Sequence, residues 1–167
     1  LPRPAAGKLT WTLTDLAGRA LAEGTRRLRA APRRSARLMT LRLAPHLKAH
    51  GARGVLLWLE LAAGGEVVST NLVTFARPKH LELAADPGLS ARVRPAGEGT
   101  FAVTLRARRP ALWAWLEIDR DDARWSDNFV HVRPGRPVEL LVRPARPLTA
   151  TQLRRRLVLR SLVDTCA

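Results

Sequence analysis

Short runs of alternating apolar and polar residues, separated by turn signals, extend along most of this sequence. In residues 9–13 the apolar side chains fall on one side of an extended chain, and residues 100–105 alternate in the same way. Residues 15–18, Gly64-Gly65 and Pro134-Gly135 have the composition that tight turns favour. Such runs, recurring about every 10 residues, are typical of an all-β sandwich. The sequence has no βαβ alternation and no glycine-rich phosphate loop before a helix.

The same pattern predicts the individual strands and a division into domains. The expected strands are residues 9–14, 19–29, 37–43, 55–61, 66–75, 100–105, 112–118 and 138–142, with a short strand after Asn128. Residues 45–54 contain one Pro and two Gly, which predicts a loop or at most one helical turn. A composition shift at residues 77–79, followed by Asp86-Pro87-Gly88, indicates a boundary. The expected domains are residues 1–78 and 79–145, followed by a basic tail at 146–167.

The tail carries a helix start signal. Thr149 and Gln152 have the spacing of a capping box, and Leu148 and Leu153 have the spacing of a hydrophobic staple. These residues predict a helix from about Ala150 to Val163, with arginines covering its exposed side.

The charge of the chain first suggests an anionic partner, because its net charge is +15. The arginines are scattered through every segment, however, and no aromatic stacking platform accompanies the denser runs at residues 26–34 and 154–156. We therefore do not expect nucleic-acid binding. No apolar run approaches the ~20 residues of a membrane span. Cys166 is the only cysteine, so it forms no internal disulfide and no cysteine metal cluster.

No group of residues predicts catalysis or metal binding, and no cofactor is expected. Among the four histidines, His46 and His50 lie four apart, but on a segment with Pro and Gly rather than on an evident helix. Ser126, Asp127 and His131 include the residue types of a catalytic triad, but one short segment cannot fold them into a relay. The acidic residues 119–122 form a predicted hairpin tip, which indicates a solvated loop.

Two tryptophans are the strongest candidates for an interaction. Trp113 and Trp115 share one face of their predicted strand, whereas the opposite face is uninterruptedly apolar and is expected to be the core. Paired indoles pointing out of a sandwich indicate a contact with another domain or a sugar platform. Of these two, contact with another domain is favoured.

Three motifs carry a resemblance to a known family. They are Ser126-Asp127-Asn128-Phe129 followed by residues 133–138, residues 71–75 followed by 78–83, and residues 9–13 with Asp15 and Gly18. In this order they resemble the C-terminal region of bacterial β-mannosidases of glycoside hydrolase family 2. The resemblance covers most of residues 8–143. The acidic tip at 121–125 and the tail from Pro144 depart from the family's pattern.

The resemblance implies two consecutive immunoglobulin-like β-sandwich modules, the first without its leading strands, followed by a short C-terminal helix. It implies a parent enzyme that releases terminal non-reducing β-D-mannose by a retaining mechanism, with both catalytic glutamates in a separate (β/α)₈ barrel. No residue of this chain matches either glutamate, so the chain alone is expected to be inactive. Its implied partners are the barrel and the other domains, with β-mannosides as substrate of the parent.

Two alternatives remain open. One is a related exo-β-glucosaminidase-type parent, and the other is a free-standing module that binds carbohydrate or protein. The compartment also stays open, although a bacterial periplasmic or secreted location is favoured over the cytoplasm.

The segment that carries the most specific motif has a structural interpretation. Asp127 and Asn128 are expected to order the entry to a strand through hydrogen bonds from backbone groups. Phe129 or its neighbours are expected to fill the core, and Pro134-Gly135 to form the next turn. Together with Ser126, these residues form the predicted structural signature of the chain.

Overall fold

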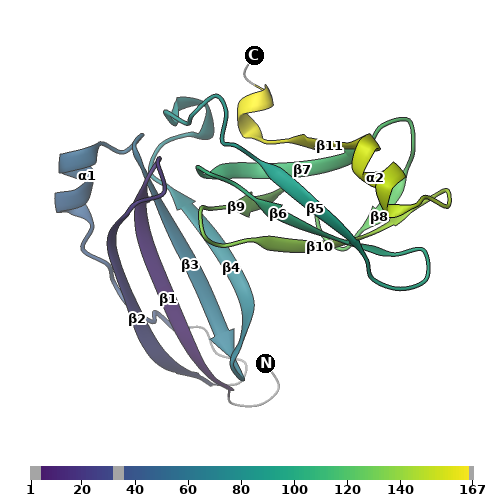
Figure 1. The fold of residues 1–167 in the computed structure, drawn as a ribbon. Helices are drawn as coiled ribbons and strands as arrows, with labels where there is room; N and C mark the ends of the chain where they lie inside the picture. The colour runs from purple at the N-terminus through teal and green to yellow at the C-terminus, as the bar shows by residue number, and fades with distance from the viewer. Residues whose placement is uncertain (1–4, 32–35, 166–167) are drawn as a thin grey trace. The chain divides into compact units, whose positions relative to one another are not determined.

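The computed structural model describes residues 5–31 and 36–165 and divides the chain into two compact units (Figure 1). Unit 1 comprises Leu1–Glu82 and unit 2 comprises Leu83–Ala167. Both units are built from antiparallel strands, so the predicted all-β class is confirmed. Neither α-helix among the described residues exceeds seven residues, and neither has the length or apolar character to cross a membrane.

Unit 1 contains one four-stranded sheet in the part of the chain that the structure describes (Figure 1). Its order is β2-β1-β3-β4, and each pair is antiparallel. The elements are β1 (Ala5–Asp15), β2 (Ala20–Ala30), α1 (Ala44–His50), β3 (Val55–Ala63), β4 (Glu66–Thr74) and the 3-10 helix η1 (Pro78–His80).

The turn between β1 and β2 is organised by Asp15, as its sequence predicts. Its Oδ1 atom accepts hydrogen bonds from the backbone N–H groups of Ala17 and Arg19, each at 2.9 Å. Gly18 adopts a φ of 88°, which glycine reaches without steric cost. Burial by itself raises the pKa of Asp15, but the hydrogen bonds from Arg19 outweigh it and hold the pKa below its usual value.

One face of the unit 1 sheet packs against the segment that joins β2 to β3. Leu13, Val55 and Leu57 are buried, and Leu41, Leu43 and Leu47 are among the side chains that pack on them. The strand expected at residues 37–43 does not form, although Leu41 and Leu43 do pack on the sheet.

Where a loop or at most one helical turn was expected, the chain forms the seven-residue helix α1. Pro45 lies in the first turn, where its missing N–H has no helical partner to lose, and Gly51 follows the last turn with a φ of 72°. Pro and Gly therefore mark the two ends of a short helix here, rather than a segment without one.

Trp11 lies flat against a glycine on the neighbouring strand. Trp11 and Gly24 are directly opposed in the β1–β2 register, and a Cβ atom at Gly24 would lie 2.8 Å from the Trp11 Nε1 atom. The absence of a side chain at Gly24 therefore provides the space that the indole occupies.

We expect Gly24→Ala to lower the free energy of unfolding of unit 1 by about 1–3 kcal/mol, because the added methyl group must displace the indole. Chemical denaturation followed by tryptophan fluorescence measures the change. In a Trp11→Leu background the same substitution is expected to have a much smaller effect, since the conflicting ring is absent. An unchanged or raised stability for Gly24→Ala alone would contradict this packing.

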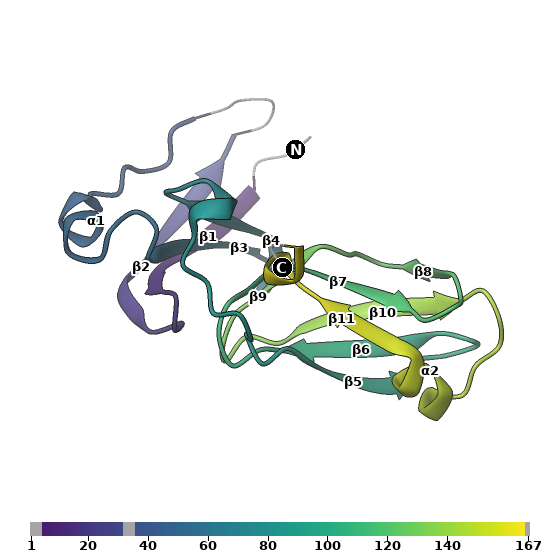
Figure 2. The same cartoon turned by 90° about the horizontal axis from the view of Figure 1, so that it is seen from above.

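Unit 2 is a two-layered β-sandwich (Figure 2). One sheet has the order β5-β6-β10-β8 and the other has the order β11-β7-β9. The elements are β5 (Ser90–Pro95), β6 (Phe101–Arg106), β7 (Ala111–Ile118), β8 (Ala123–Trp125), β9 (Val130–Val132), β10 (Val138–Pro144), α2 (Ala150–Arg156), β11 (Leu157–Arg160) and the 3-10 helix η2 (Leu162–Thr165).

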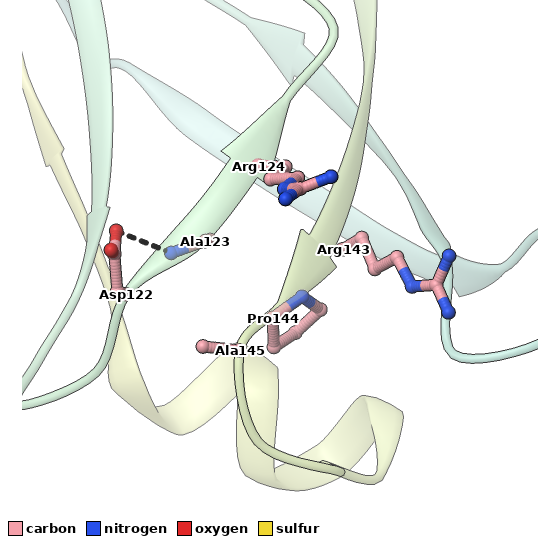
Figure 3. A pocket seen from close by; sticks show the side chains of 6 residues that line it. All are labelled: Asp122, Ala123, Arg124, Arg143, Pro144 and Ala145. Carbon is pink, nitrogen blue, oxygen red and sulfur yellow. Dashed lines mark hydrogen bonds between the residues drawn. The ribbon is translucent and has the colours of Figure 1, made fainter.

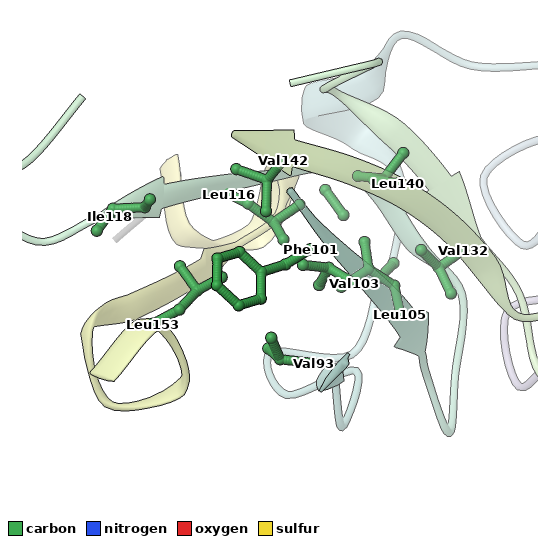
Figure 4. Packing of buried hydrophobic residues seen from close by; sticks show 12 residues of the cluster. Val93, Phe101, Val103, Leu105, Leu116, Ile118, Val132, Leu140, Val142 and Leu153 are labelled. Carbon is green, nitrogen blue, oxygen red and sulfur yellow. The ribbon is translucent and has the colours of Figure 1, made fainter. Parts of the chain in front are cut away.

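The core of unit 2 is filled from both sheets and from α2 (Figure 4). Phe101 and Val142 come from the first sheet, Leu116 and Val132 from the second, and Leu153 from the helix. Ala114, Leu116 and Ile118 of β7 pack in the core as predicted. Leu112 is buried but does not belong to this core cluster, and Ala111 joins it instead, before the shift in register.

The C-terminal tail packs in the sandwich as α2 and β11, and its helix is shorter than predicted. The capping box forms, since the Thr149 side chain accepts from the Gln152 N–H and the Gln152 side chain accepts from the Thr149 N–H. The expected helix, however, ends at Arg156 instead of Val163. Leu157–Arg160 form β11, which pairs with β7 from Leu157↔Ile118 to Arg160↔Trp115. The apolar run Leu157-Val158-Leu159 lies next to an open edge of β7, which favours this outcome over a longer helix.

Candidate interaction surface

Among the described residues, histidine and acidic side chains form no cluster that could bind a metal ion. No group of three or more His, Cys, Asp or Glu side chains in residues 5–31 and 36–165 could hold a metal ion. His46 and His50 lie on α1, His80 on η1 and His131 on β9. Cys166 lies outside the described residues.

The three triad-like side chains each bind a backbone group instead of one another. Ser126 Oγ accepts from the Leu141 N–H at 2.9 Å, and Asp127 Oδ1 accepts from the Asn128 N–H at 2.8 Å. His131 Nδ1 accepts from the Trp113 N–H at 3.1 Å. These contacts order the chain around β9 and form no proton relay.

The side chain of Asn128 makes the hydrogen bonds to β7 that a backbone pair of the β7–β9 ladder would otherwise make. The β7–β9 ladder runs from Ala111↔Val132 to Ala114↔Val130, so its next partners would be Leu116 and Asn128. At that point the Asn128 side chain accepts from the Leu116 N–H at 2.9 Å and donates to the Leu116 carbonyl at 3.1 Å. The amide thus satisfies both backbone groups of Leu116 and fixes the segment before β9 against β7.

The prediction that Phe129 or its neighbours fill the core holds for the neighbours but not for Phe129 itself. Its backbone φ is 59° and its side chain is 60% exposed. The left-handed conformation directs the ring outward, where it stacks on Trp115 with ring centroids 5.8 Å apart and planes at 23°. Val130 and Val132 pack against the core in its place.

Trp113 is held in a similarly unusual conformation. Its φ is 46°, and the β7–β9 register shifts between Ala111 and Ala114 around it. Its ring meets His131 edge-on, with centroids 4.9 Å apart and planes at 77°. Trp113, Trp115, Phe129 and His131 together form what we call the aromatic surface of the β11-β7-β9 sheet.

Backbone strain accompanies this surface. Only Trp113, Arg120 and Phe129 have positive φ values among the non-glycine residues that the structure describes, and two of these three belong to the aromatic surface. Each such residue costs about 1–3 kcal/mol and persists only where its surroundings enforce it. Such strain is typical of sites where a protein contacts a ligand or a partner.

His131 makes the same region sensitive to pH. Burial lowers the pKa of His131 below its ordinary value of 6.5, and the Nδ1 atom must stay unprotonated to accept from the Trp113 N–H. The folded state therefore binds this proton less readily than the unfolded state. Its contribution to stability is complete above pH 6.5 and is lost as the pH falls from there through the lower folded pKa.

We therefore expect the free energy of unfolding of unit 2 to fall when the pH is lowered from 7.5 to 5.5. Urea denaturation of wild type and His131→Gln at both pH values measures this effect. The variant should lose much of the pH dependence, while His50→Gln, on the exposed end of α1, should retain it. Equal pH dependence in wild type and His131→Gln would contradict the assignment to this histidine.

The sequence alone indicated Trp113 and Trp115 but missed Phe129 and His131 as members of this surface. A signal for Phe129 was present, because the preceding Ser-Asp-Asn run is rich in residues that form side-chain-to-backbone turns. A periodic pattern does not reveal a residue with a left-handed backbone conformation, so the sequence could not distinguish Phe129 from its neighbours as the core residue.

Comparisons with known proteins match both units. Residues 1–80 match the model of the mannosidase Ig/CBM-like domain, and residues 84–165 match an Ig-fold domain model of mannosidases. A search of curated proteins found no match.

Solved structures share the fold. A β-D-mannosidase from Dictyoglomus thermophilum superposes with a TM-score of 0.74 at 18% identity, covering 96% of this chain and 19% of that one. An exo-chitosanase from Amycolatopsis orientalis gives a TM-score of 0.57 at 16% identity, covering 96% of this chain and 23% of that one. The chain thus spans about one fifth of the length of these relatives.

Proposed function

We propose that this chain, which belongs to the immunoglobulin-like sandwich domains of glycoside hydrolase family 2 enzymes, is the accessory, non-catalytic portion of a retaining exo-β-mannosidase. The parent enzyme then hydrolyses terminal non-reducing β-D-mannose residues. The observation that carries the proposal is the tandem match of residues 1–80 and 84–165 to two mannosidase-associated domains in consecutive order.

The arrangement of carboxylates supports a non-catalytic role. A retaining glycosidase needs two carboxyl groups about 5–5.5 Å apart across a cleft that holds the sugar. The acidic residues of the β7–β8 hairpin instead contact arginines at 4.0 Å, Asp119 with Arg120 and Asp121 with Arg146. Catalysis is therefore assigned to a domain outside this chain.

The aromatic surface supplies the contact with that domain in this proposal. Phe129 is 60% exposed and strained, a combination that is unfavourable for a module whose surface meets only water. Aromatic side chains are enriched in the buried centres of protein interfaces. We assign Trp113, Trp115 and Phe129 to an interface with another domain, where they brace the catalytic domain.

The activity is tested by assaying the purified chain and the full-length gene product on p-nitrophenyl β-D-mannoside and p-nitrophenyl β-D-glucosaminide. We expect no turnover by the chain and hydrolysis of the mannoside by the full-length protein. Turnover by the chain alone would refute the accessory role. Preference of the full-length protein for the glucosaminide would favour the alternative parent, an exo-β-glucosaminidase-type enzyme, which the likeness to the exo-chitosanase supports.

The interface is tested in the full-length protein with Trp115→Ser/Phe129→Ser. We expect a lower melting temperature of the assembled enzyme, with the isolated chain losing much less stability. Leu141→Ser is the matched control, because Leu141 is 44% exposed on the other sheet of unit 2. Equal losses in the isolated chain and the full-length protein would reject the interface.

Binding of mannan oligosaccharide by the isolated chain, lost in Trp113→Ala/Trp115→Ala, would favour a carbohydrate-binding module instead.

A further inference from the structure

Two arginines face each other across a strand pair in unit 2. Arg124 on β8 is directly opposite Arg143 on β10, in an antiparallel register that also pairs Val142 with Trp125. Directly opposed residues of this kind have Cβ atoms about 4.5–5.5 Å apart, and like charges at that position repel each other. The pair is therefore unfavourable unless an anion lies near it.

No acidic side chain of the described residues offsets this repulsion. Neither guanidinium has a carboxylate partner within 4.0 Å among residues 5–31 and 36–165. Another arginine of the same sheet does have a carboxylate partner. Both carboxylate oxygens of Glu139 accept from Arg94 at 2.9 Å. Arg124 and Arg143 lack such a partner within the chain.

A hollow of about 560 Å³ lies beside the pair (Figure 3). Its remaining lining comes from Asp122, Ala123, Pro144 and Ala145. This volume falls within the range of small-molecule sites, roughly 300–1,000 Å³. Pro144 and Ala145 provide an apolar wall, so the hollow combines cationic, anionic and apolar groups.

Asp122 contributes a carboxylate, which accepts hydrogen bonds, to the lining of the hollow. Its Oδ1 atom accepts from the Ala123 N–H at 2.8 Å, the contact drawn in Figure 3. Its Oδ2 atom has no hydrogen-bond partner within the described residues and remains available as an acceptor. The hollow thus presents guanidinium donors for an anion and a carboxylate oxygen for a hydroxyl group.

We propose that this hollow binds an acidic sugar, with the carboxylate of a uronic acid held by Arg124 and Arg143 and a ring hydroxyl donating to Asp122. Guanidinium groups match planar carboxylates in both geometry and charge. The apolar wall of Pro144 and Ala145 suits the C–H surface of a sugar ring. This site goes beyond the proposed function, because it lies on the opposite sheet from the aromatic surface and requires no catalytic domain.

The site is tested by NMR titration of the purified chain at constant ionic strength with sodium D-glucuronate, sodium acetate and D-mannose. We expect saturable shifts of the amide signals of residues 123–125 and 143–145 with glucuronate. Acetate should bind at least 10-fold more weakly because it lacks the hydroxyls, and mannose should not bind because it lacks the carboxylate. Equal affinity for acetate, saturable binding of mannose, or no saturation by glucuronate would overturn the proposal.

Two double variants distinguish binding of glucuronate at this hollow from its general attraction to a positively charged protein. Arg124→Gln/Arg143→Gln should weaken glucuronate binding at least 10-fold, with a melting temperature unchanged or raised because the repulsion is gone. Arg155→Gln/Arg156→Gln removes the same charge from the exposed side of α2 and should leave the affinity unchanged. Equal weakening by both double variants would reject the site. None of these readouts depends on hydrolysis, so their failure is distinct from failure of the proposed function.

Discussion

Deleting residues 148–167 is expected to unfold unit 2. The deletion removes Leu153, which is fully buried among core residues of both sheets, and β11, which pairs with β7 along its length. Truncating one buried leucine to alanine costs about 2–5 kcal/mol. Losing that side chain together with an entire strand therefore approaches the total stability of a typical domain, about 5–15 kcal/mol.

Near-ultraviolet circular dichroism and urea denaturation of the truncated chain measure this effect. We expect the cooperative transition of unit 2 to disappear, and Leu153→Ala in the intact chain to lower its free energy of unfolding by about 2–5 kcal/mol. Arg155→Leu, on the exposed side of the same helix, is the matched control for a change in α2 and should cost far less. A truncated chain that retains a cooperative unit 2 transition would show that the tail is dispensable.

The tail also illustrates what local sequence signals can and cannot define. A capping box acts within one turn, so Thr149 and Gln152 correctly predicted where α2 begins. The end of the helix depends on an open edge of β7, a strand some 40 residues earlier in the chain. Tertiary pairing of this kind overrides helix propensity, and the capping signals near the start of the helix do not report it.

The strands of both units were largely predictable for a related reason. Alternation in β1 and β7 reflects burial of one face, so Leu13 and Leu116 were correctly placed inside before any partner strand was known. Leu41 and Leu43 alternate in the segment 37–43 and pack on the sheet, yet the segment has no hydrogen-bonded partner strand. Periodicity therefore reports which side chains are buried and does not report pairing.

The candidate surface was predictable only in part. The indoles of β7 lie opposite the core face, which the pattern indicated, whereas Phe129 points outward because of its backbone conformation. A positive φ at a phenylalanine requires specific enforcement by its neighbours. Here the Phe129 N–H donates to Asn128 Oδ1 at 3.2 Å, and Asn128 is itself anchored to Leu116.

Replacing Asn128 by alanine is expected to lower the free energy of unfolding of unit 2 by about 2–4 kcal/mol. The substitution leaves the N–H and carbonyl groups of Leu116 without partners, and each unsatisfied buried group costs about 1–3 kcal/mol. It also removes the acceptor that helps hold Phe129 in its left-handed conformation. The aromatic surface should therefore lose its fixed geometry together with stability.

Two further variants distinguish this mechanism from a general effect of the loop. Asp127→Ala removes only a hydrogen bond from the exposed Asn128 N–H and should cost less than about 1 kcal/mol. Asn128→Asp keeps the shape and the acceptor for the Leu116 N–H, but it places a carboxylate oxygen against the Leu116 carbonyl in place of an amide donor. We expect its stability to be close to that of Asn128→Ala at pH 7 and to exceed that of Asn128→Ala at low pH, where the protonated carboxyl group can donate again, because loss of stability through His131 is common to both variants. Urea denaturation at both pH values provides the test, and an Asp127→Ala loss as large as that of Asn128→Ala would show that the amide does not replace a strand pair.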